Sequence, residues 1–363
     1  PIYEYSELAL NIITVVGMST AFFAATVALV QTDIKKIIAY STCSQLGYMF
    51  FAAGVGAYHV AIFHLFTHAF FKALLFLGSG SVIHSLNDEQ DVRNMGDLWK
   101  KMPVTWFAMV VGTLALTGFP FLSGFYSKDA IIEFAFLKGT NVGYFAAGIG
   151  IMTAVLTALY SWRLIFKTFH GKFNSKNISK SEIHESGLTI TIPLLLLVVG
   201  SIFSGFLFKE FLIGHNYNNF WRDSILILEK FDHSGIPLWL LVITPFFVTI
   251  LIPVSFYLYI KKTNVLDGIV LKYKSLYNFL LNKWYFDELY NQIIIKPTKF
   301  IGSFFWEKGD IKIIDRLGPD GISKIIKIIS NKSSKFQSGY IYDYAFIMLI
   351  GLSLLLTFFI FYK

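Results

Sequence analysis

The stretch AYHVAIFHLFTHAFFKALLFLGSGSVIH, residues 57–84, decides the fold, because it is long enough to cross a bilayer and yet carries His64, His68 and Lys72. These residues recur every four positions, so they stack along one helical face about 6 Å apart along the axis. A lysine near the centre of a spanning helix costs roughly 2.5–3.5 kcal/mol on insertion scales and usually faces a bundle interior or a hydrated cavity. Histidine changes charge readily near neutral pH. The three residues, termed the ladder below, predict a proton-conducting element.

Packing and metal binding are the alternatives for these polar groups. His59 and His84 stand alone near the expected helix ends, where interfacial water can satisfy them, and we interpret both as structural. Packing is also the alternative for the ladder, but three costly groups on one face are hard to explain in that way. Two histidines four residues apart can share a metal, yet no acidic residue or cysteine adjoins them. We therefore expect neither a metal nor a cofactor in this chain.

The composition is that of a polytopic membrane protein. Of the 363 residues, 55% are hydrophobic and 15% are charged, and the mean hydropathy is +0.59. Runs of about 20 mainly apolar residues recur along the chain, which is typical of repeated membrane spans. The net charge of +8 requires no nucleic acid as a partner, because basic loops are expected on the cytoplasmic side of a membrane.

The cysteine content excludes an internal disulfide and an iron–sulfur cluster held by four of this chain's own thiolates. Cys43 is the only cysteine, so neither an internal disulfide nor a cluster held by four thiolates can form. Any redox chemistry therefore belongs to a partner.

The start of the chain is unlike a signal peptide. Pro1 is the first residue, and Glu4 and Glu7 precede the first apolar run, whereas a signal peptide begins with basic residues. We expect a fragment whose beginning is missing.

The apolar runs predict an all-α bundle of transmembrane helices with one discontinuous helix, a long amphipathic helix and a terminal anchoring span. The expected spans are residues 8–30, 34–54, 57–84, 104–138, 142–169, 188–208, 237–260 and 341–362. By role, the chain divides into two first helices (1–56), a channel core (57–169), further transmembrane helices and loops (170–283), the amphipathic helix (284–336) and the anchor (337–363).

One face of the second span is polar and must meet protein or water rather than lipid. Its polar residues are Tyr40, Ser41, Thr42, Ser44, Gln45 and Tyr48. Polar contacts between helices and a hydrated pathway are both open as interpretations.

The run 104–138 is interrupted by Gly118-Phe119-Pro120 and is followed by Lys128, Asp129 and Glu133. Because proline removes a backbone donor and clashes with the preceding turn, we expect the helix to break near Pro120. Broken backbone at membrane depth recurs at the ion sites of transporters, so we interpret Lys128 as functional. The alternative is a turn near the surface with Lys128 and Asp129 as an interfacial ion pair. Asp129 is either a partner that modulates Lys128 or a carboxylate favoured by the start of a helix.

The loop charges predict the orientation, and Arg163 and Lys167 are expected to snorkel towards an interface. If every span crosses, one side receives Lys35, Lys36, Arg93, Lys100, Lys101, Lys172, Lys176, Lys180, Lys261, Lys262, Lys272, Lys274 and Lys283. The other side receives Lys138, Lys209, Arg222 and Lys230. The first side should be the cytoplasm, or the matrix in a mitochondrion.

Residues 284–336 alternate apolar and charged groups and contain no run long enough to cross a membrane. This pattern predicts a helix along an interface, which could extend roughly 75 Å. We expect Pro297 and Gly318-Pro319 to kink or split it. A simple surface anchor is one interpretation, but the terminal span that follows favours a clamp across neighbouring helices or subunits.

Three motifs carry a resemblance to a known family. LVQTDIKKIIAYSTCSQLGYM (29–49), FHLFTHAFFKALLF (63–76) and FYSKDAI (125–131) resemble the antiporter-like membrane subunits of proton-pumping NADH:quinone oxidoreductase, respiratory complex I. The same motifs also mark the multisubunit sodium/proton antiporters. WYFDELY (284–290) and the helices that follow it are similar to the lateral helix and anchor of the complex I subunit termed L, or 5 in mitochondria.

The resemblance implies proton transfer by Lys72, His64 and His68, and by Lys128 and Asp129 beside the proton exit. It further implies a subunit without its own redox cofactor, coupled to quinone reduction in partners, with subunits of the M and N type and the lipid bilayer as neighbours. A bacterial inner membrane is expected, with the mitochondrial inner membrane as the alternative and the lateral helix on the cytoplasmic or matrix side. An earlier repeat of the family, with a membrane glutamate and another lysine, has no counterpart in this chain. A sodium/proton antiporter subunit and a structural membrane brace are the alternative functions.

Overall fold

The computed structural model describes residues 6–174, 182–214, 216–222, 224–225 and 235–362. Apart from one isolated bridge between Asp33 and Asp91, every regular element in these residues is a helix. The expected all-α class is therefore confirmed. The chain forms two compact units, Pro1–Trp284 and Tyr285–Lys363, which are described separately.

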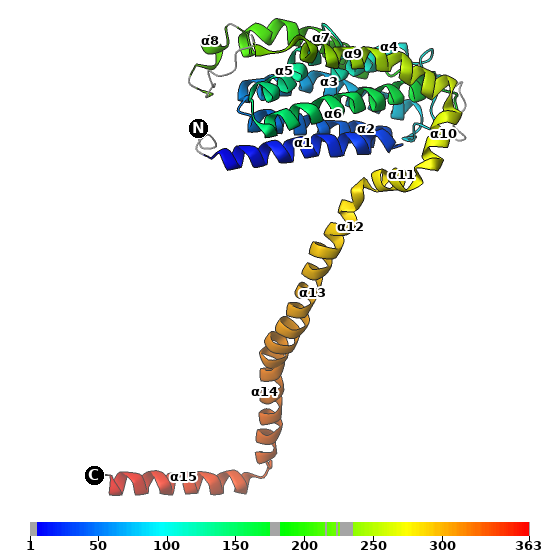
Figure 1. Ribbon diagram of the computed structural model, residues 1–363. Coiled ribbons are helices and arrows are strands. Elements are labelled where there is room, and N and C mark those ends of the chain that lie inside the picture. Colours follow the sequence, from blue (N-terminus) through cyan, green and yellow to red (C-terminus); the bar gives the residue numbers. More distant parts are fainter. Residues whose placement is uncertain (1–5, 175–181, 215, 223, 226–234, 363) are drawn as a thin grey trace. The chain divides into compact units, whose positions relative to one another are not determined.

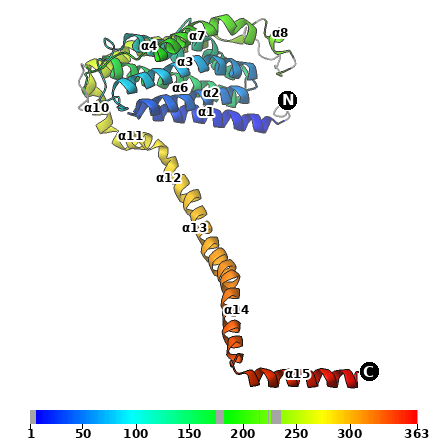
Figure 2. The same cartoon turned by 180° about the vertical axis from the view of Figure 1, so that it is seen from behind.

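The first unit is a bundle in which long helices lie alongside one another (Figure 1), as the reverse view also shows (Figure 2). Its helices are α1 (Glu7–Val30), α2 (Ile34–Gly54), α3 (Tyr58–Ser85), α4 (Pro103–Thr117), α5 (Ser123–Leu137), α6 (Asn141–Ile165), α7 (Leu188–Leu212), α8 (Tyr217–Trp221), α9 (Leu238–Phe256), α10 (Thr263–Lys272) and α11 (Lys274–Leu281). A π-helical turn extends α6 to His170, and another extends α9 to Lys261.

Six helices of the described chain are long and apolar enough to cross a membrane: α1, α3, α6 and α9 with their extensions, α7, and α15 (Ile341–Phe361). The remaining expected spans deviate for reasons visible in the sequence. Helix α2 is as long as a span, but its polar face lowers its hydropathy, while α4 and α5 are the two halves of the expected broken helix. The polytopic bundle is confirmed.

Close packing of α1 on α2 turns the polar face of α2 towards the interior. A Cβ atom added to Gly47 would lie 2.5 Å from the backbone nitrogen of Ala21, so only glycine allows this approach. At the same contact the Ser44 hydroxyl donates to the Ala21 carbonyl at 2.8 Å. Ser44 therefore joins the two helices, whereas Ser41, Gln45 and Tyr48 on the same helix contact the site described below.

The expected break lies between α4 and α5. Helix α4 ends at Gly118, whose φ of +83° is in the left-handed region that glycine adopts without strain. Pro120 lies in the short connection, and α5 begins at Ser123. Gly124 is in van der Waals contact with α4, since a Cβ there would lie 1.9 Å from the Ala115 carbonyl oxygen. The two half-helices thus stay packed together, and the first turns of α5 lie inside the bundle.

One end of the bundle is joined by contacts between distant segments. The Arg163 guanidinium donates to the Leu29 carbonyl at 2.6 Å and to the Gln31 carbonyl at 2.7 Å, at the end of α1. The Gln31 amide donates to the Leu281 carbonyl at 3.3 Å, and the Trp99 backbone nitrogen donates to the Phe169 carbonyl at 3.4 Å. The segments near 31, 99, 169 and 281 therefore meet at one end, as the alternation of loops requires.

The expectation that Arg163 snorkels is wrong. Its side chain is buried, at 7% exposure, because the last carbonyl groups of α1 need donors and the guanidinium supplies them. Lys176, Lys180 and Lys230, which entered the count of loop charges, lie outside the described residues, as do Pro1 and Glu4.

The second unit consists of α12 (Phe286–Tyr290), a π turn (Asn291–Ile295), α13 (Lys296–Phe304), a π segment (Phe305–Asp315), α14 (Pro319–Ser333) and α15. Helical backbone continues through Pro297, which lies at the start of α13 directly after a π turn, so the chain is not split there. Prolines and π turns are both sites at which long helices kink, and the kink stays a prediction. The expected split at Gly318 is present, since its ψ of −105° is not helical. None of the described side chains of α12, α13, α14 or α15 is buried.

Candidate functional site

The ladder lies on the interior face of α3. Helix α3 packs against α2, α4, α5 and α7, and this surrounding removes its polar side chains from lipid. The exposed fractions are 0% for His64, 5% for His68 and 5% for Lys72. Because buried polar groups require partners, the contacts of each residue define what the site can do.

Lys72 is bonded to side chains of two other helices. Its ammonium donates to the Ser41 hydroxyl of α2 at 2.8 Å. The Tyr160 hydroxyl of α6 donates to the same oxygen, also at 2.8 Å. Ser41 thus accepts two hydrogen bonds and connects α3 to α6.

His64 of α3 makes side-chain contacts with both α2 and α5. Its Nδ1 lies 2.9 Å from the Ser127 hydroxyl, and its Nε2 lies 3.2 Å from the Gln45 side-chain oxygen. The Thr67 hydroxyl, one turn along α3, is 2.7 Å from the same Ser127 oxygen. Because Ser127 directly precedes Lys128, this cluster links the ladder to the broken helix through hydroxyl and imidazole groups that can exchange protons.

His68 lies between His64 and Lys72 in the ladder. Its ring centroid is 6.0 Å from that of His64 and 5.3 Å from that of Phe71. Its buried Nε2 has no hydrogen bond in the described part of the chain. The ladder is therefore a series of spaced groups, with no direct bond from His68 to either neighbour among the contacts of the described residues.

Lys128 is fully buried, with 0% exposure. Its ammonium lies 3.5 Å from the Thr117 carbonyl at the end of α4 and 5.5 Å from the centre of the Tyr48 ring. Tyr48 is itself held by a hydrogen bond to the Gly150 carbonyl of α6. A cation at a helix C-terminus is stabilised by the helix dipole, and an aromatic face adds a cation–π attraction. The alternative of a surface turn does not fit this burial.

Asp129 is the carboxylate next to this cation. It is the seventh residue of α5 and lies beyond the first turn, where a helix start favours carboxylates. Both of its oxygens are buried without hydrogen bonds in the described residues, but Lys128 and Glu133 are both within electrostatic reach. The position favours a charge that modulates Lys128 over a helix-start carboxylate.

The two histidines interpreted as structural differ from each other. His84 is exposed at the end of α3, as expected. His59 is 3% exposed and lies against the rings of Phe134 and Tyr217. The expectation that interfacial water surrounds His59 is therefore wrong, because α5 and α8 cover it.

Several contact residues were not identified from the sequence. Thr67 and Ser127 could have been found by position, since one is three residues after His64 and the other adjoins Lys128. Tyr160 gave no signal, because a tyrosine in an apolar helix is ordinary and its partner Ser41 is distant in the chain. Ser41, Gln45 and Tyr48 were recognised as a polar face, but their partners could not be assigned.

Two protein-family models match the chain. Residues 1–157 match the family model described as NADH:quinone oxidoreductase/Mrp antiporter, transmembrane, and residues 160–220 match the C-terminus of NADH dehydrogenase subunit 5. The chain is 42% identical to the NADH-ubiquinone oxidoreductase chain 5 of Arabidopsis thaliana over 99% of its own length and 55% of that protein. It is 43% identical to the NADH-quinone oxidoreductase subunit L of Rickettsia bellii, with 99% and 56% covered. The chain thus spans about half the length of these relatives.

A solved structure shares the fold. The Mrp complex from Dietzia sp. contains a chain that superposes with a TM-score of 0.52 at 21% identity, covering 61% of this chain and 49% of that one. At this identity the similarity concerns the fold alone.

Proposed function

The chain belongs to the family of antiporter-like membrane subunits of NADH:quinone oxidoreductase that includes chain 5 and subunit L, and on this basis we propose that its buried lysines and histidines translocate protons. The driving reaction is NADH oxidation and quinone reduction in partner subunits. The proton path runs between Lys72, with His68 and His64, and Lys128, with Asp129 as the adjacent charge.

One observation carries this proposal. His64 reaches Ser127 at 2.9 Å, so the ladder on α3 contacts the residue that directly precedes Lys128 on the broken helix. If the ladder served packing alone, each of its polar groups would need only a hydrogen-bond partner at its own position. The contact of His64 with Ser127 instead joins the ladder helix to the helix that carries Lys128.

Electrostatic repulsion supplies the coupling between the two lysines. Two ammonium groups in a low-dielectric interior repel each other more strongly than in water, so a proton arriving at Lys72 favours release of one from Lys128. Release from Lys128 also removes its attraction to the Thr117 carbonyl and to Asp129. A charge or conformational change from partner subunits would set the direction, with Lys128 discharging towards the non-cytoplasmic side.

The amphipathic helices of the second unit are the surface for which we propose partner subunits. Their side chains are exposed in this chain, and apolar residues such as Phe300, Phe304 and Ile325 remain without cover. We propose that they lie along neighbouring membrane subunits of the M and N type on the cytoplasmic or matrix side, held at the far end by α15.

Replacement of Lys128 by alanine in the intact complex tests the proposal. The ratio of protons pumped to NADH oxidised should fall while the assembled complex remains. Lys138→Ala is the matched control, because this lysine lies at the end of the same helix and donates to the Gly54 carbonyl at 3.1 Å, away from the axis. Unchanged stoichiometry in the Lys128 variant would contradict the proposal.

A sodium/proton antiporter subunit is the second candidate. The description of the matching family names the Mrp antiporters beside NADH:quinone oxidoreductase, and this is the observation behind the second candidate. Exchange driven by a sodium gradient in vesicles, without NADH, would identify it, whereas pumping that needs NADH and no sodium supports the complex I role.

A further inference from the structure

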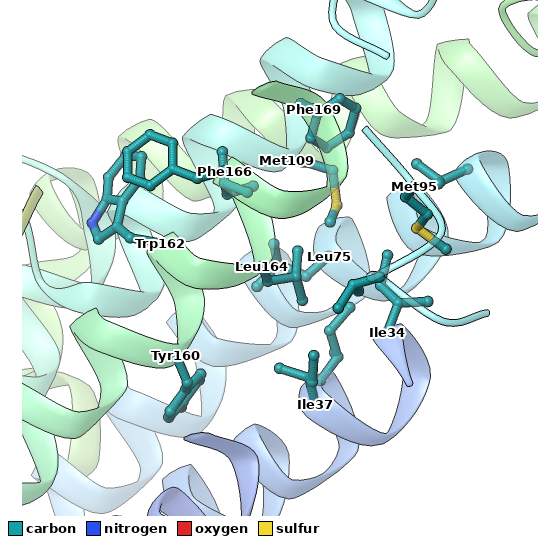
Figure 3. Packing of buried hydrophobic residues seen from close by; sticks show 14 of the residues in the cluster. Ile34, Ile37, Leu75, Met95, Met109, Tyr160, Trp162, Leu164, Phe166 and Phe169 are labelled. Atoms are coloured by element: carbon teal, nitrogen blue, oxygen red, sulfur yellow. The ribbon is translucent and has the colours of Figure 1, made fainter. Parts of the chain in front are cut away.

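The described part of the second unit has apolar side chains but no buried core. In the first unit, Trp162, Phe166 and Phe169 lie in one buried cluster with Leu75 and Met109 (Figure 3). By contrast, none of the described side chains of α14 is buried. A helix gains most of its stability from the packing of its apolar side, so that side of α14 requires a membrane or a partner as cover.

Helix α14 separates its apolar residues from its basic ones. Because the helix has 3.6 residues per turn, Ile322, Ile325 and Ile329 lie along one side, and Lys324 and Lys327 lie along the other. The three isoleucines are exposed in this chain. They are available to the neighbouring membrane subunits proposed above, and the lysine side is left for another contact.

The balance of charge changes along the second unit. Residues 286–320 carry six acidic side chains and five basic ones, which are Lys296, Lys299, Lys308, Lys312 and Arg316. Residues 321–342 carry no acidic side chain and four basic ones, which are Lys324, Lys327, Lys332 and Lys335. The next carboxylate, Asp343, accepts a hydrogen bond from the Ser338 hydroxyl, and no ion pair involves the four lysines in the described part of the chain. These four lysines, termed the basic surface below, therefore have no counter-charge of their own.

The chain itself keeps the basic surface close to the membrane. Lys335 precedes Ile341, the first residue of the spanning helix α15, by six residues, so the two lie at most roughly 22 Å apart. Tyr340 and Tyr342 are exposed at the same end of α15, and tyrosines are enriched at the level of the lipid headgroups. The basic surface therefore lies near the headgroups of the bilayer that α15 enters.

We propose that the basic surface binds the phosphate groups of anionic phospholipids. Clusters of lysines beside a span or on an amphipathic helix attract such headgroups. Lysine is a hydrated charge on a flexible stem, so it can follow mobile phosphate groups. A protein partner fits less well, because lysine is depleted from protein interfaces. The inference goes beyond the proposed function and does not rest on proton translocation.

Phosphatidylglycerol with a photoreactive headgroup tests the site in the intact complex, reconstituted in phosphatidylcholine vesicles. Cross-links mapped by mass spectrometry should include residues 321–342, and phosphatidylcholine with the same photoreactive group should label them much less. Higher salt should weaken the labelling, because it screens exposed charges. Equal labelling of residues 321–342 by the two lipids would overturn the proposal.

Lys327→Gln tests the role of charge, with Lys308→Gln as the matched control. Lys308 is also exposed in the second unit, but it lies in the stretch where acidic residues balance the basic ones. The mole fraction of phosphatidylglycerol that gives half-maximal labelling should rise about fivefold in Lys327→Gln, which corresponds to about 1 kcal/mol. It should not change in Lys308→Gln. An unchanged value in Lys327→Gln would overturn the proposal.

A high-resolution map of the same complex distinguishes a lipid from a protein partner. We expect lipid density with its phosphate within about 4 Å of the lysine ammonium groups. Carboxylates of a neighbouring subunit in that place would overturn the proposal. Neither result depends on pumping, so the lipid site can fail while the proposed function holds, and normal pumping by Lys72→Met would overturn only the proposed function.

Discussion

At the scale of single residues, Ser127 has the most informative position. Its oxygen is within hydrogen-bond distance of both His64 and Thr67, and it is the polar group of α5 that meets the ladder. Ser127→Ala should reduce proton pumping about tenfold if one hydrogen bond of about 1.4 kcal/mol is lost from the transfer step. Protons pumped per NADH oxidised in vesicles is the measurement.

Ser127→Thr is the control for this change, because it keeps the hydroxyl and adds a methyl group. Recovery of pumping in the threonine variant would assign the effect to the hydroxyl. Equal activity of the alanine variant and the wild type would show that His64 and Lys128 communicate without Ser127.

Arg163 gives a prediction about stability rather than transport. Arg163→Met should destabilise the bundle by about 3 kcal/mol, because the Leu29 and Gln31 carbonyls lose their buried donor. The temperature at which the subunit is lost on heating the purified complex measures this effect. Lys167→Met, four residues further along and only partly buried, should shift that temperature less; an equal shift would indicate that charge near the membrane surface is the cause.

At the scale of elements, α4 depends on a cap from a distant loop. Its own N-cap residue, Met102, provides no side-chain bond. The Glu185 carboxylate instead accepts from the backbone nitrogens of Val104 at 2.8 Å and Thr105 at 3.2 Å, and from the Thr105 hydroxyl at 2.5 Å. A carboxylate at this end also complements the helix dipole, so the loop before α7 fixes the start of the broken helix.

Loss of this cap should cost about 1–2 kcal/mol in Glu185→Ala and less in Glu185→Gln, which keeps an acceptor. Thermal stability of the purified complex is the measurement. Glu182→Ala is the control, because Glu182 is exposed in the same loop. A Glu185→Ala complex as stable as the control would mean that packing alone holds α4 in place.

The helices also show which features of the fold and the site could be predicted from the sequence. The spacing of His64, His68 and Lys72 is a local property, so their common interior face and the break after Gly118 could be predicted. The partner of Arg163 could not, because it lies at the end of a helix far away in the chain. The contacts of Ser41 likewise depend on how α2 packs against α3 and α6, which carry its partners Lys72 and Tyr160. The π turn before Pro297 could not be predicted either, because no local composition signals it.

At the scale of the whole molecule, transport and assembly should be separable. Deletion of residues 307–336 should prevent stable assembly with neighbouring membrane subunits, because it removes most of the exposed amphipathic surface. Lys72→Met should leave assembly intact and abolish pumping. Native gel electrophoresis of solubilised membranes, together with NADH-driven pumping, measures both.

The opposite pattern identifies a structural brace. If Lys72→Met pumps normally while the deletion disperses the complex, the ladder is packing and the subunit acts by holding its neighbours together.

The contacts of Arg163 and Gln31 also determine when, during synthesis, this end of the bundle can form. Arg163 is bonded to a carbonyl 134 residues earlier, and Gln31 to one 250 residues later. At about 5–20 residues per second, synthesis needs roughly 7 to 27 s (134/20 to 134/5) to produce the first donor and roughly 12 to 50 s to reach the second acceptor. Until then, the Leu29 and Gln31 carbonyls at the end of α1 remain exposed to water in the nascent protein. Translation products that stop before residue 163 cannot close this end of the bundle, and they should be degraded faster than those that extend beyond it.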